Sequence, residues 1–234
     1  MSDHFDNKDI FMGDASRNED NQSLDEFLEA YDSNKYEKAA NTVDTLVLTH
    51  SGSFGETGTT YKVLMIKRRN HPCIGYWALP GGFVEMDEDL EQAAKRELEE
   101  ETGIKDVAVE QLHTWGAVKR DPRTRIITTS YLAVAEEGKL CPKAGDDAED
   151  AAWFHIRLAR EACSEAGYGL VNTYRLELTN EEKEVELKAL VKVGCRKDSL
   201  LRQGEYTILE SVCIAGDHSS LIIQALLRLG LTKI

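Results

Sequence analysis

The sequence predicts an α/β protein, a sandwich of helices and a mixed β-sheet. Segments rich in β-branched and apolar residues recur along most of the chain, bounded by turn-forming residues. Two other segments have the apolar spacing of a helix, one near the middle of the chain and one at its end. Strands on both sides of a central helix, with a further helix at the end, favour an α/β sandwich around a mixed sheet.

The first part of the chain is expected to lie outside this sandwich. Its first 22 residues are polar and acidic, which is typical of a tail with too little apolar surface to form a core. Ser23 followed by Glu26 has the spacing of a capping box and predicts a short helix that ends near Tyr36. We therefore expect an acidic tail with a short helix over residues 1–40 and a main domain over residues 41–234.

The main domain is expected to contain several short strands and two helices. A helix over residues 88–101 is stopped by Gly103, and Asp217 begins the last helix as its capping residue. The β-rich region at about residues 165–214 is interpreted as an insertion. Strands are expected at residues 43–49, 61–68, 77–84, 107–115, 125–135, 151–156 and 206–214, with a hairpin over 170–194.

Charge and cysteine content restrict the partners of this protein. The formal net charge of −14 disfavours binding to nucleic acid or to an anionic membrane, because both carry negative charge. The five cysteines form no Cys-x-x-Cys pair, so reduced thiols are expected rather than a disulfide framework or a zinc site. The N-terminus lacks a secretory signal and no apolar stretch is long enough to span a membrane, which indicates a cytoplasmic protein.

The central helix carries carboxylates where apolar side chains are expected. Glu97 and Glu101 fall on its packed face and Glu100 lies beside them, whereas Arg96 and Glu88 fall on other faces and are expected to form a structural ion pair. Two carboxylates at ~6 Å and an effective dielectric of ~20 repel by ~3 kcal/mol. Hard carboxylate oxygens are the ligands that Mg²⁺ or Mn²⁺ prefers, so a metal site is favoured over a solvated acidic helix. The packed face consists of Leu90, Ala93, Ala94, Glu97, Leu98 and Glu101.

The stretch from Gly82 to Ile104 resembles the signature of the Nudix family, G-x5-E-x7-R-E-U-x-E-E-x-G-U, in which U is apolar. All nine defined positions match, and the preceding WALPGG is similar to the usual lead-in of the family. The resemblance covers about residues 42–156 and the last helix, and it implies the Nudix-type α/β/α sandwich. The matching residues are Gly82, Glu88, Arg96, Glu97, Leu98, Glu100, Glu101, Gly103 and Ile104.

The resemblance also implies roles for individual residues. Bound Mg²⁺, or Mn²⁺, would polarise a diphosphate and activate a water molecule. Many relatives place an acidic residue before the strand expected at 151–156, as a base or an extra ligand, which favours Asp147 or Asp146 here. The implied metal ligands are Glu97, Glu100 and Glu101, with the carbonyl of Gly81 as a further ligand.

Basic residues in the loop from Lys119 to Arg125 suggest a phosphate-binding surface in an otherwise acidic chain, although a solvated loop is the alternative. The string WGAVKRDPRTRIITTSYLAV resembles a Nudix subgroup of ADP-ribose pyrophosphatases and regulators of NAD metabolism. Pro122 lies somewhat later than the proline common in the ADP-ribose enzymes. The implied substrate-binding residues are Arg68, Arg120, Arg123 and Arg125.

The subgroup implies hydrolysis of ADP-ribose to AMP and ribose 5-phosphate. Two alternatives stay open: clean-up of nucleoside triphosphates, and nucleotide sensing with little turnover. The sensing relatives continue into a winged-helix domain, whereas this sequence stops at Ile234, soon after a helix in which His218 is expected to be structural. We therefore expect a small nucleotide-derived substrate, no nucleic-acid or membrane partner, and a homodimer like the similar enzymes.

Overall fold

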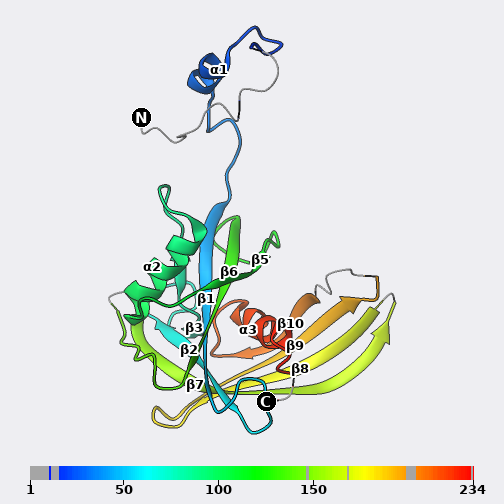
Figure 1. Cartoon of the computed structure of the whole chain (residues 1–234). Coiled ribbons are helices and arrows are strands. Elements are labelled where there is room, and N and C mark those ends of the chain that lie inside the picture. The colour runs from blue at the N-terminus through cyan, green and yellow to red at the C-terminus, as the bar shows by residue number, and fades with distance from the viewer. Residues whose placement is uncertain (1–10, 12–15, 146–147, 168, 199–203, 233) are drawn as a thin grey trace. The chain divides into compact units, whose positions relative to one another are not determined.

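The computed structural model (Figure 1) forms two compact units, Met1–Lys38 and Ala39–Ile234. The first unit contains helix α1 (Leu24–Ala30), which begins with the predicted capping box: the N–H of Glu26 donates to Ser23 Oγ (3.2 Å), and the N–H of Ser23 donates to the Glu26 carboxylate (2.7 Å). The structure describes residues 11, 16–145, 148–167, 169–198, 204–232 and 234.

Helix α1 ends at Ala30, earlier than the predicted end near Tyr36. Tyr31 is already extended, with φ −70° and ψ 114°. Beyond it, the Asp32 carboxylate accepts a hydrogen bond from the N–H of Asn34 at 2.9 Å. Aspartate side chains that bind nearby backbone amides stabilise turns in competition with a helix, which explains the early end.

The second unit is built on one ten-stranded sheet. Its main path runs β10-β9-β8-β7-β2-β1-β6-β5, with β3 on β2 and β4 on β1. β1 and β6 are parallel and the other strand pairs are antiparallel, so the sheet is mixed, as predicted. The strands are β1 (Ala40–Ser51), β2 (Thr60–Arg68), β3 (Trp77–Ala78), β4 (Gly81–Phe83), β5 (Glu110–Trp115), β6 (Ile126–Glu136), β7 (Ala148–Ala166), β8 (Gly169–Asn180), β9 (Val185–Arg196) and β10 (Gly204–Val212).

Helices cover both faces of the sheet, as β1 illustrates. Successive side chains of a strand point to opposite faces. Val43 and Val47 pack in a cluster with apolar residues of α2 (Leu90–Thr102), whereas Leu46 packs in the cluster that contains α3 (His218–Arg228). Figure 1 shows the two helices on either side of β1 and β2, which confirms the predicted α/β/α sandwich.

Strands β1 and β2 separate along their length, and this separation places the functional site. They pair with each other over Leu48–Ser51 of β1, but further back β1 pairs with β4 through Thr42–Asp44. The connection between β3 and β4 fills the space, because the N–H of Thr45 donates to the carbonyl of Pro80 at 2.7 Å. Side chains from both faces of the sheet can therefore approach the same region.

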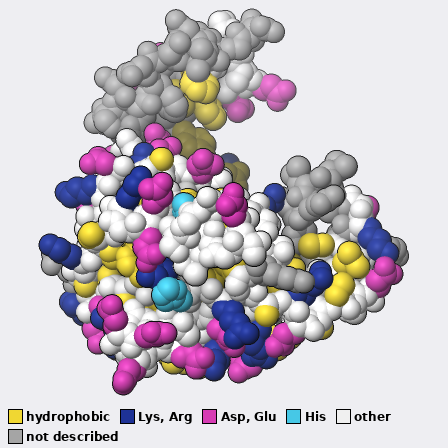
Figure 2. Space-filling view, turned by 60° about the horizontal axis from the view of Figure 1, so that its bottom comes forward, with side chains coloured by type: hydrophobic (Ala, Val, Ile, Leu, Met, Phe, Trp, Pro, Cys, Tyr) yellow, Lys and Arg dark blue, Asp and Glu magenta, His cyan; other side chains and the backbone are white. Residues whose placement is uncertain are grey.

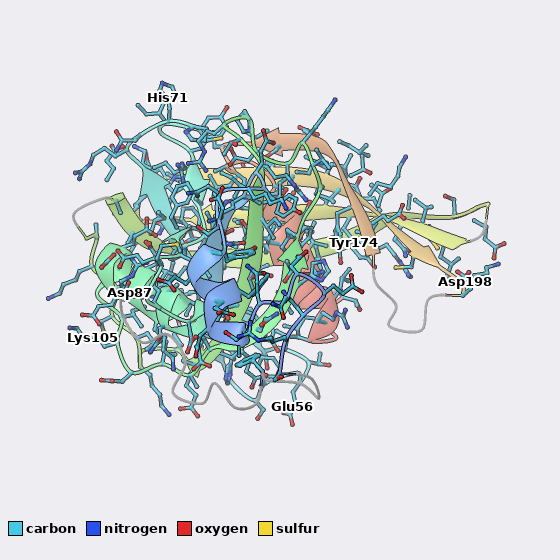
Figure 3. The ribbon with its side chains drawn as sticks, turned by 90° about the horizontal axis from the view of Figure 1, so that it is seen from above. Glu56, His71, Asp87, Lys105, Tyr174 and Asp198 are labelled. Atoms are coloured by element: carbon cyan, nitrogen blue, oxygen red, sulfur yellow. The ribbon has the colours of Figure 1, made fainter. Side chains whose placement is uncertain are left out.

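Strand β7 is much longer than the predicted strand at residues 151–156. It pairs with β8 from His155 opposite Thr179 to the end of the strand at Ala166. Partner strands override the weak local strand preference of this polar segment. Figure 3 labels Tyr174 within the resulting extension of the sheet and Asp198 at its far end.

Helix α3 is buried on every side. All residues from Ser219 to Leu226 are buried, including three polar ones. The long strands β7–β9 supply the apolar side chains around it, and the carbonyl of Ile234 accepts from the N–H of Leu158 at 2.9 Å. A helix covered on all sides is a core helix. Within the described part of the chain, none of the helices combines the length and apolar character needed to cross a membrane.

Candidate active site

Helix α2 is placed by features of its own sequence. It begins at Leu90 rather than at Glu88, because Asp89 is the extended N-cap residue (φ −76°, ψ 157°) and its N–H donates to the Gln92 side chain at 2.8 Å. It ends at Gly103, whose φ of +68° is a left-handed conformation that glycine adopts without strain. Its end therefore agrees with the sequence prediction, and its start is displaced by two residues.

The two glycines of β4 allow the backbone to approach the carboxylates of α2. A Cβ atom on Gly82 would lie 2.4 Å from Glu97 Oε1, and one on Gly81 would lie 2.1 Å from the carbonyl of Val43. The N–H of Gly81 donates to Glu101 Oε2 at 2.8 Å. A side chain at position 81 would therefore collide with the backbone of β1, whereas one at position 82 would displace the Glu97 carboxylate.

Burial makes the ionised forms of two α2 glutamates unfavourable. Glu101 is 9% exposed, and burial raises its pKa to about 8, against the opposing hydrogen bond from Gly81. Burial also raises the pKa of Glu97, although the guanidinium of Arg96 opposes this effect. The predicted conflict between carboxylates and a packed face is therefore present in the structure.

Arg96 is more than the partner of Glu88. It makes the predicted ion pair with Glu88, with hydrogen bonds of 3.0 and 2.7 Å. The same guanidinium also donates to Glu97 at 2.8 Å and to Glu100 at 2.9 Å. The expectation that Arg96 lies away from the glutamate face is wrong, because its long side chain reaches back across the helix surface.

The donor set of α2 fits a hard divalent cation. Within the described ranges, no group of three or more acidic, histidine or cysteine side chains is arranged to hold a metal ion. Glu100 and one oxygen of Glu97 are instead bound by the guanidinium of Arg96. The chemistry nevertheless suits Mg²⁺, since the half-buried Glu97 and the buried Glu101 offer carboxylate oxygens, and burial makes their negative charge unfavourable unless a cation offsets it.

A cavity of 460 Å³ opens where β1 and β2 separate. Side chains of α2, the residues before α3, and the loops after β2 and β5 all line it. On the face of the second unit seen in Figure 2, basic and acidic side chains are interspersed. The chain as a whole has a formal net charge of −14, so the arginines around this cavity are a local concentration of positive charge. The arginines lining the cavity are Arg68, Arg69, Arg96, Arg120 and Arg123.

Arg120 lines the cavity but is already bound to protein groups. Its guanidinium donates to both carboxylate oxygens of Asp217, at 2.9 and 2.8 Å, and to Thr128 Oγ1 at 2.7 Å. The side chain is 8% exposed. Asp217 is the N-cap residue of α3, as predicted, but its side chain makes no capping bond. Its carboxylate instead forms this ion pair, which joins the loop after β5 to the start of α3.

The other predicted substrate arginines differ in position. Arg68 lines the cavity and donates to the carbonyl of Pro72 at 2.7 Å, in the loop whose His71 is labelled in Figure 3. Arg123 lines it too, paired with Asp121 and lying 5.3 Å from the ring centre of Phe83. Arg125 donates to a backbone carbonyl at 3.1 Å and is absent from the described cavity lining.

Two cavity residues were missed by the sequence analysis. Asp44 of β1 is 8% exposed, and burial raises its pKa, against the opposing charges of His218 and Arg120. His218 lies with its Nε2 3.8 Å from Asp44 Oδ1. Neither belongs to a recognisable motif, and the two are distant in sequence. Asp147 and Asp146, the predicted base or extra ligand, lie outside the described residues, although the N–H of the preceding Gly145 donates to the Glu101 carbonyl at 3.0 Å.

Residues 52–169 match the NUDIX domain family. The match, together with the sandwich and the glutamates of α2 beside the cavity, shows that this chain belongs to the Nudix family. A MutT/nudix family protein from Enterococcus faecalis has a similar structure, with a TM-score of 0.64 and 33% identity, over 89% of this chain and 70% of that protein.

Two sequence relatives are more specific. The ADP-ribose pyrophosphatase of Methanocaldococcus jannaschii is 43% identical over 95 residues, which cover 41% of this chain and 55% of the relative. The ADPR responsive transcriptional repressor NtrR of Acinetobacter baylyi is 38% identical over 110 residues, which cover 46% of this chain and 42% of the repressor. The chain therefore spans about half the length of these two relatives.

Proposed function

We propose that this Nudix protein hydrolyses the diphosphate bond of ADP-ribose and releases AMP and ribose 5-phosphate. The observation that carries the proposal is the cavity itself, which is lined by the half-buried Glu97 and the buried Glu101 as well as by Arg68 and Arg123. Carboxylates of this kind suit a divalent cation, and arginines suit phosphate oxygens. The 43% identity with an ADP-ribose pyrophosphatase supports this choice of substrate.

Each group of residues has a separate part in the proposed reaction. When bound, Mg²⁺ or Mn²⁺ would supply Lewis acidity toward the diphosphate and make a water molecule more acidic. Arg68 and Arg123 would bind the phosphate oxygens and reduce the repulsion between the substrate and an acidic protein. Asp147 is kept as the proposed base. The residues proposed to hold the metal are Glu97, Glu100, Glu101 and the Gly81 carbonyl.

A nucleotide sensor is the second candidate, because the chain is also 38% identical to an ADPR-responsive repressor over their matched region. A sensor has no need of clustered glutamates that burial makes unfavourable, so we favour the enzyme. A small nucleotide substrate, location in the cytoplasm, a homodimer and the absence of a specific duplex-DNA partner remain part of the proposal. The charge of −14 supports the last of these, because DNA is also negatively charged.

A substrate panel with magnesium tests the proposal. ADP-ribose and several nucleoside triphosphates are incubated with the protein, and products are identified by chromatography. AMP with ribose 5-phosphate from ADP-ribose supports it, whereas pyrophosphate released from a triphosphate, with ADP-ribose intact, identifies a triphosphatase. Tight binding of ADP-ribose without turnover, or a sequence-dependent DNA complex below micromolar concentration at physiological salt, would identify a sensor. A Glu97→Gln variant controls for contaminating hydrolases.

A further inference from the structure

His218 is held in one orientation and one tautomer by the backbone. The N–H of Leu79 donates to His218 Nδ1 at 2.9 Å. A nitrogen that accepts a hydrogen bond carries no proton, so in the neutral ring the proton is on Nε2. His218 lines the cavity at the start of α3, and its side chain is 13% exposed. It therefore offers a fixed N–H donor beside the cavity.

Asp44 offers an acceptor next to this donor. Its Oδ1 lies 3.8 Å from His218 Nε2, which is too long for a hydrogen bond. The Thr128 hydroxyl interacts with the Asp44 carboxyl, but a carboxyl has room for several hydrogen bonds. Asp44 also lines the cavity, and its side chain is 12% exposed. Donor and acceptor thus face the same cavity without bonding to each other.

The chemistry of this pair selects a hydroxyl group as its ligand. A hydroxyl both accepts, as the His218 N–H requires, and donates, as the Asp44 carboxyl requires. An oxygen about 2.8 Å from each group would fit between two atoms at this separation. A phosphate oxygen accepts only and would be repelled by Asp44, whose neighbouring cation Arg120 is already paired with Asp217. The phosphates are better placed beside Arg68 and Arg123.

We propose that Asp44 and His218 together bind a ribose hydroxyl of the nucleotide substrate. This inference rests on the proposed function, because it assigns the sugar of ADP-ribose to the end of the cavity between β1 and α3. The two riboses of ADP-ribose share the hydroxyl chemistry, and the hydrolysis products separate them. AMP carries one ribose and ribose 5-phosphate carries the other.

A matched pair of variants at His218 tests the inference. In His218→Asn, the side-chain oxygen can still accept from Leu79, but the donor at the position of Nε2 is lost. His218→Gln places an amide donor close to that position. Binding of AMP, of ribose 5-phosphate and of their 2′- or 2-deoxy forms is measured by calorimetry with magnesium, where no turnover occurs, and thermal midpoints control for folding.

We expect His218→Asn to weaken binding of one of the two products by about 10-fold, and Asp44→Asn to weaken the same product by about 10- to 100-fold. His218→Gln should restore most of the affinity. If the bound hydroxyl is the one that the deoxy compound lacks, wild type should bind the deoxy compound more weakly than the parent product. His218→Asn should then bind the two compounds equally. Unchanged affinity of folded His218→Asn for both products overturns the inference, as does an equal loss in His218→Gln. Turnover of ADP-ribose by the wild type is measured in parallel: its absence refutes the proposed function, whereas its presence with unchanged product binding refutes the hydroxyl site alone.

Discussion

Replacing Glu101 by glutamine should separate metal binding from structural support. Glu101 Oε2 accepts a hydrogen bond from the N–H of Gly81 at 2.8 Å. A glutamine amide has nearly the same shape and keeps an acceptor oxygen for this bond, but it does not ionise. The Glu101→Gln variant therefore removes the charge while leaving the contact between α2 and β4 available.

The size of the effect follows from the pKa of Glu101, which burial raises from 4.5 to about 8. The folded protein therefore binds more protons than the unfolded chain between these pH values, and its stability falls as pH rises through this range. One pKa unit corresponds to about 1.4 kcal/mol, so the buried charge removes at most about 5 kcal/mol above pH 8 and about 3 kcal/mol at pH 7. The Glu101→Gln variant does not lose this stability, because glutamine does not ionise.

Unfolding by denaturant in EDTA, at pH 5 and pH 8, measures the effect. The stability of the variant relative to wild type should increase from pH 5 to pH 8. Its magnesium-dependent turnover should fall ~100-fold or more, because a charge that stabilises the transition state is lost. Glu91→Gln is the matched control, because Glu91 lies on the same helix with its side chain 56% exposed, and it should alter neither property much. A Glu101→Gln protein that is markedly less stable in EDTA at pH 8, yet hydrolyses substrate normally, would refute the reasoning.

Three further predictions concern neighbouring residues. Gly82→Ala should abolish turnover, because its Cβ would lie 2.4 Å from the Glu97 carboxylate, and turnover comparable to wild type in a folded Gly82→Ala protein would contradict this. Arg123→Ala should raise KM for ADP-ribose about 10-fold in steady-state kinetics. Arg125→Ala should leave KM nearly unchanged, because Arg125 is absent from the described cavity lining. Equal effects of the two substitutions on KM would contradict the assignment of Arg123 to substrate binding. Arg120→Lys should lower the free energy of unfolding by about 1–3 kcal/mol. Lysine does not reproduce the paired hydrogen bonds that the guanidinium of Arg120, which is 8% exposed, makes with Asp217. An unchanged denaturation midpoint would refute this.

Local features of this protein were readable from the sequence because they depend on residues close together in the chain. The spacing of Glu97 and Glu101 is enough to place them on the packed face of a helix, since 3.6 residues per turn fixes that geometry. Gly103 predicted the end of the same helix, because a left-handed position favours glycine. The hairpin expected over residues 170–194 was also local, and β8 and β9 form it, with Asn180 opposite Val185.

Features that depend on distant parts of the chain were decided only by the tertiary structure. The length of β7 was underestimated because β8, rather than the local sequence, stabilises most of it. Arg96 reaches Glu97 and Glu100, two of the proposed metal ligands, through side-chain conformations that residue spacing does not specify. Asp44 and His218 are 174 positions apart in the numbering and come within 3.8 Å because β1 and β2 separate beside the start of α3. The sequence alone therefore determined which carboxylates share one face of α2. Packing between β1, α2 and α3 determined which other groups line the same cavity, because contacts between distant segments follow from the complete fold.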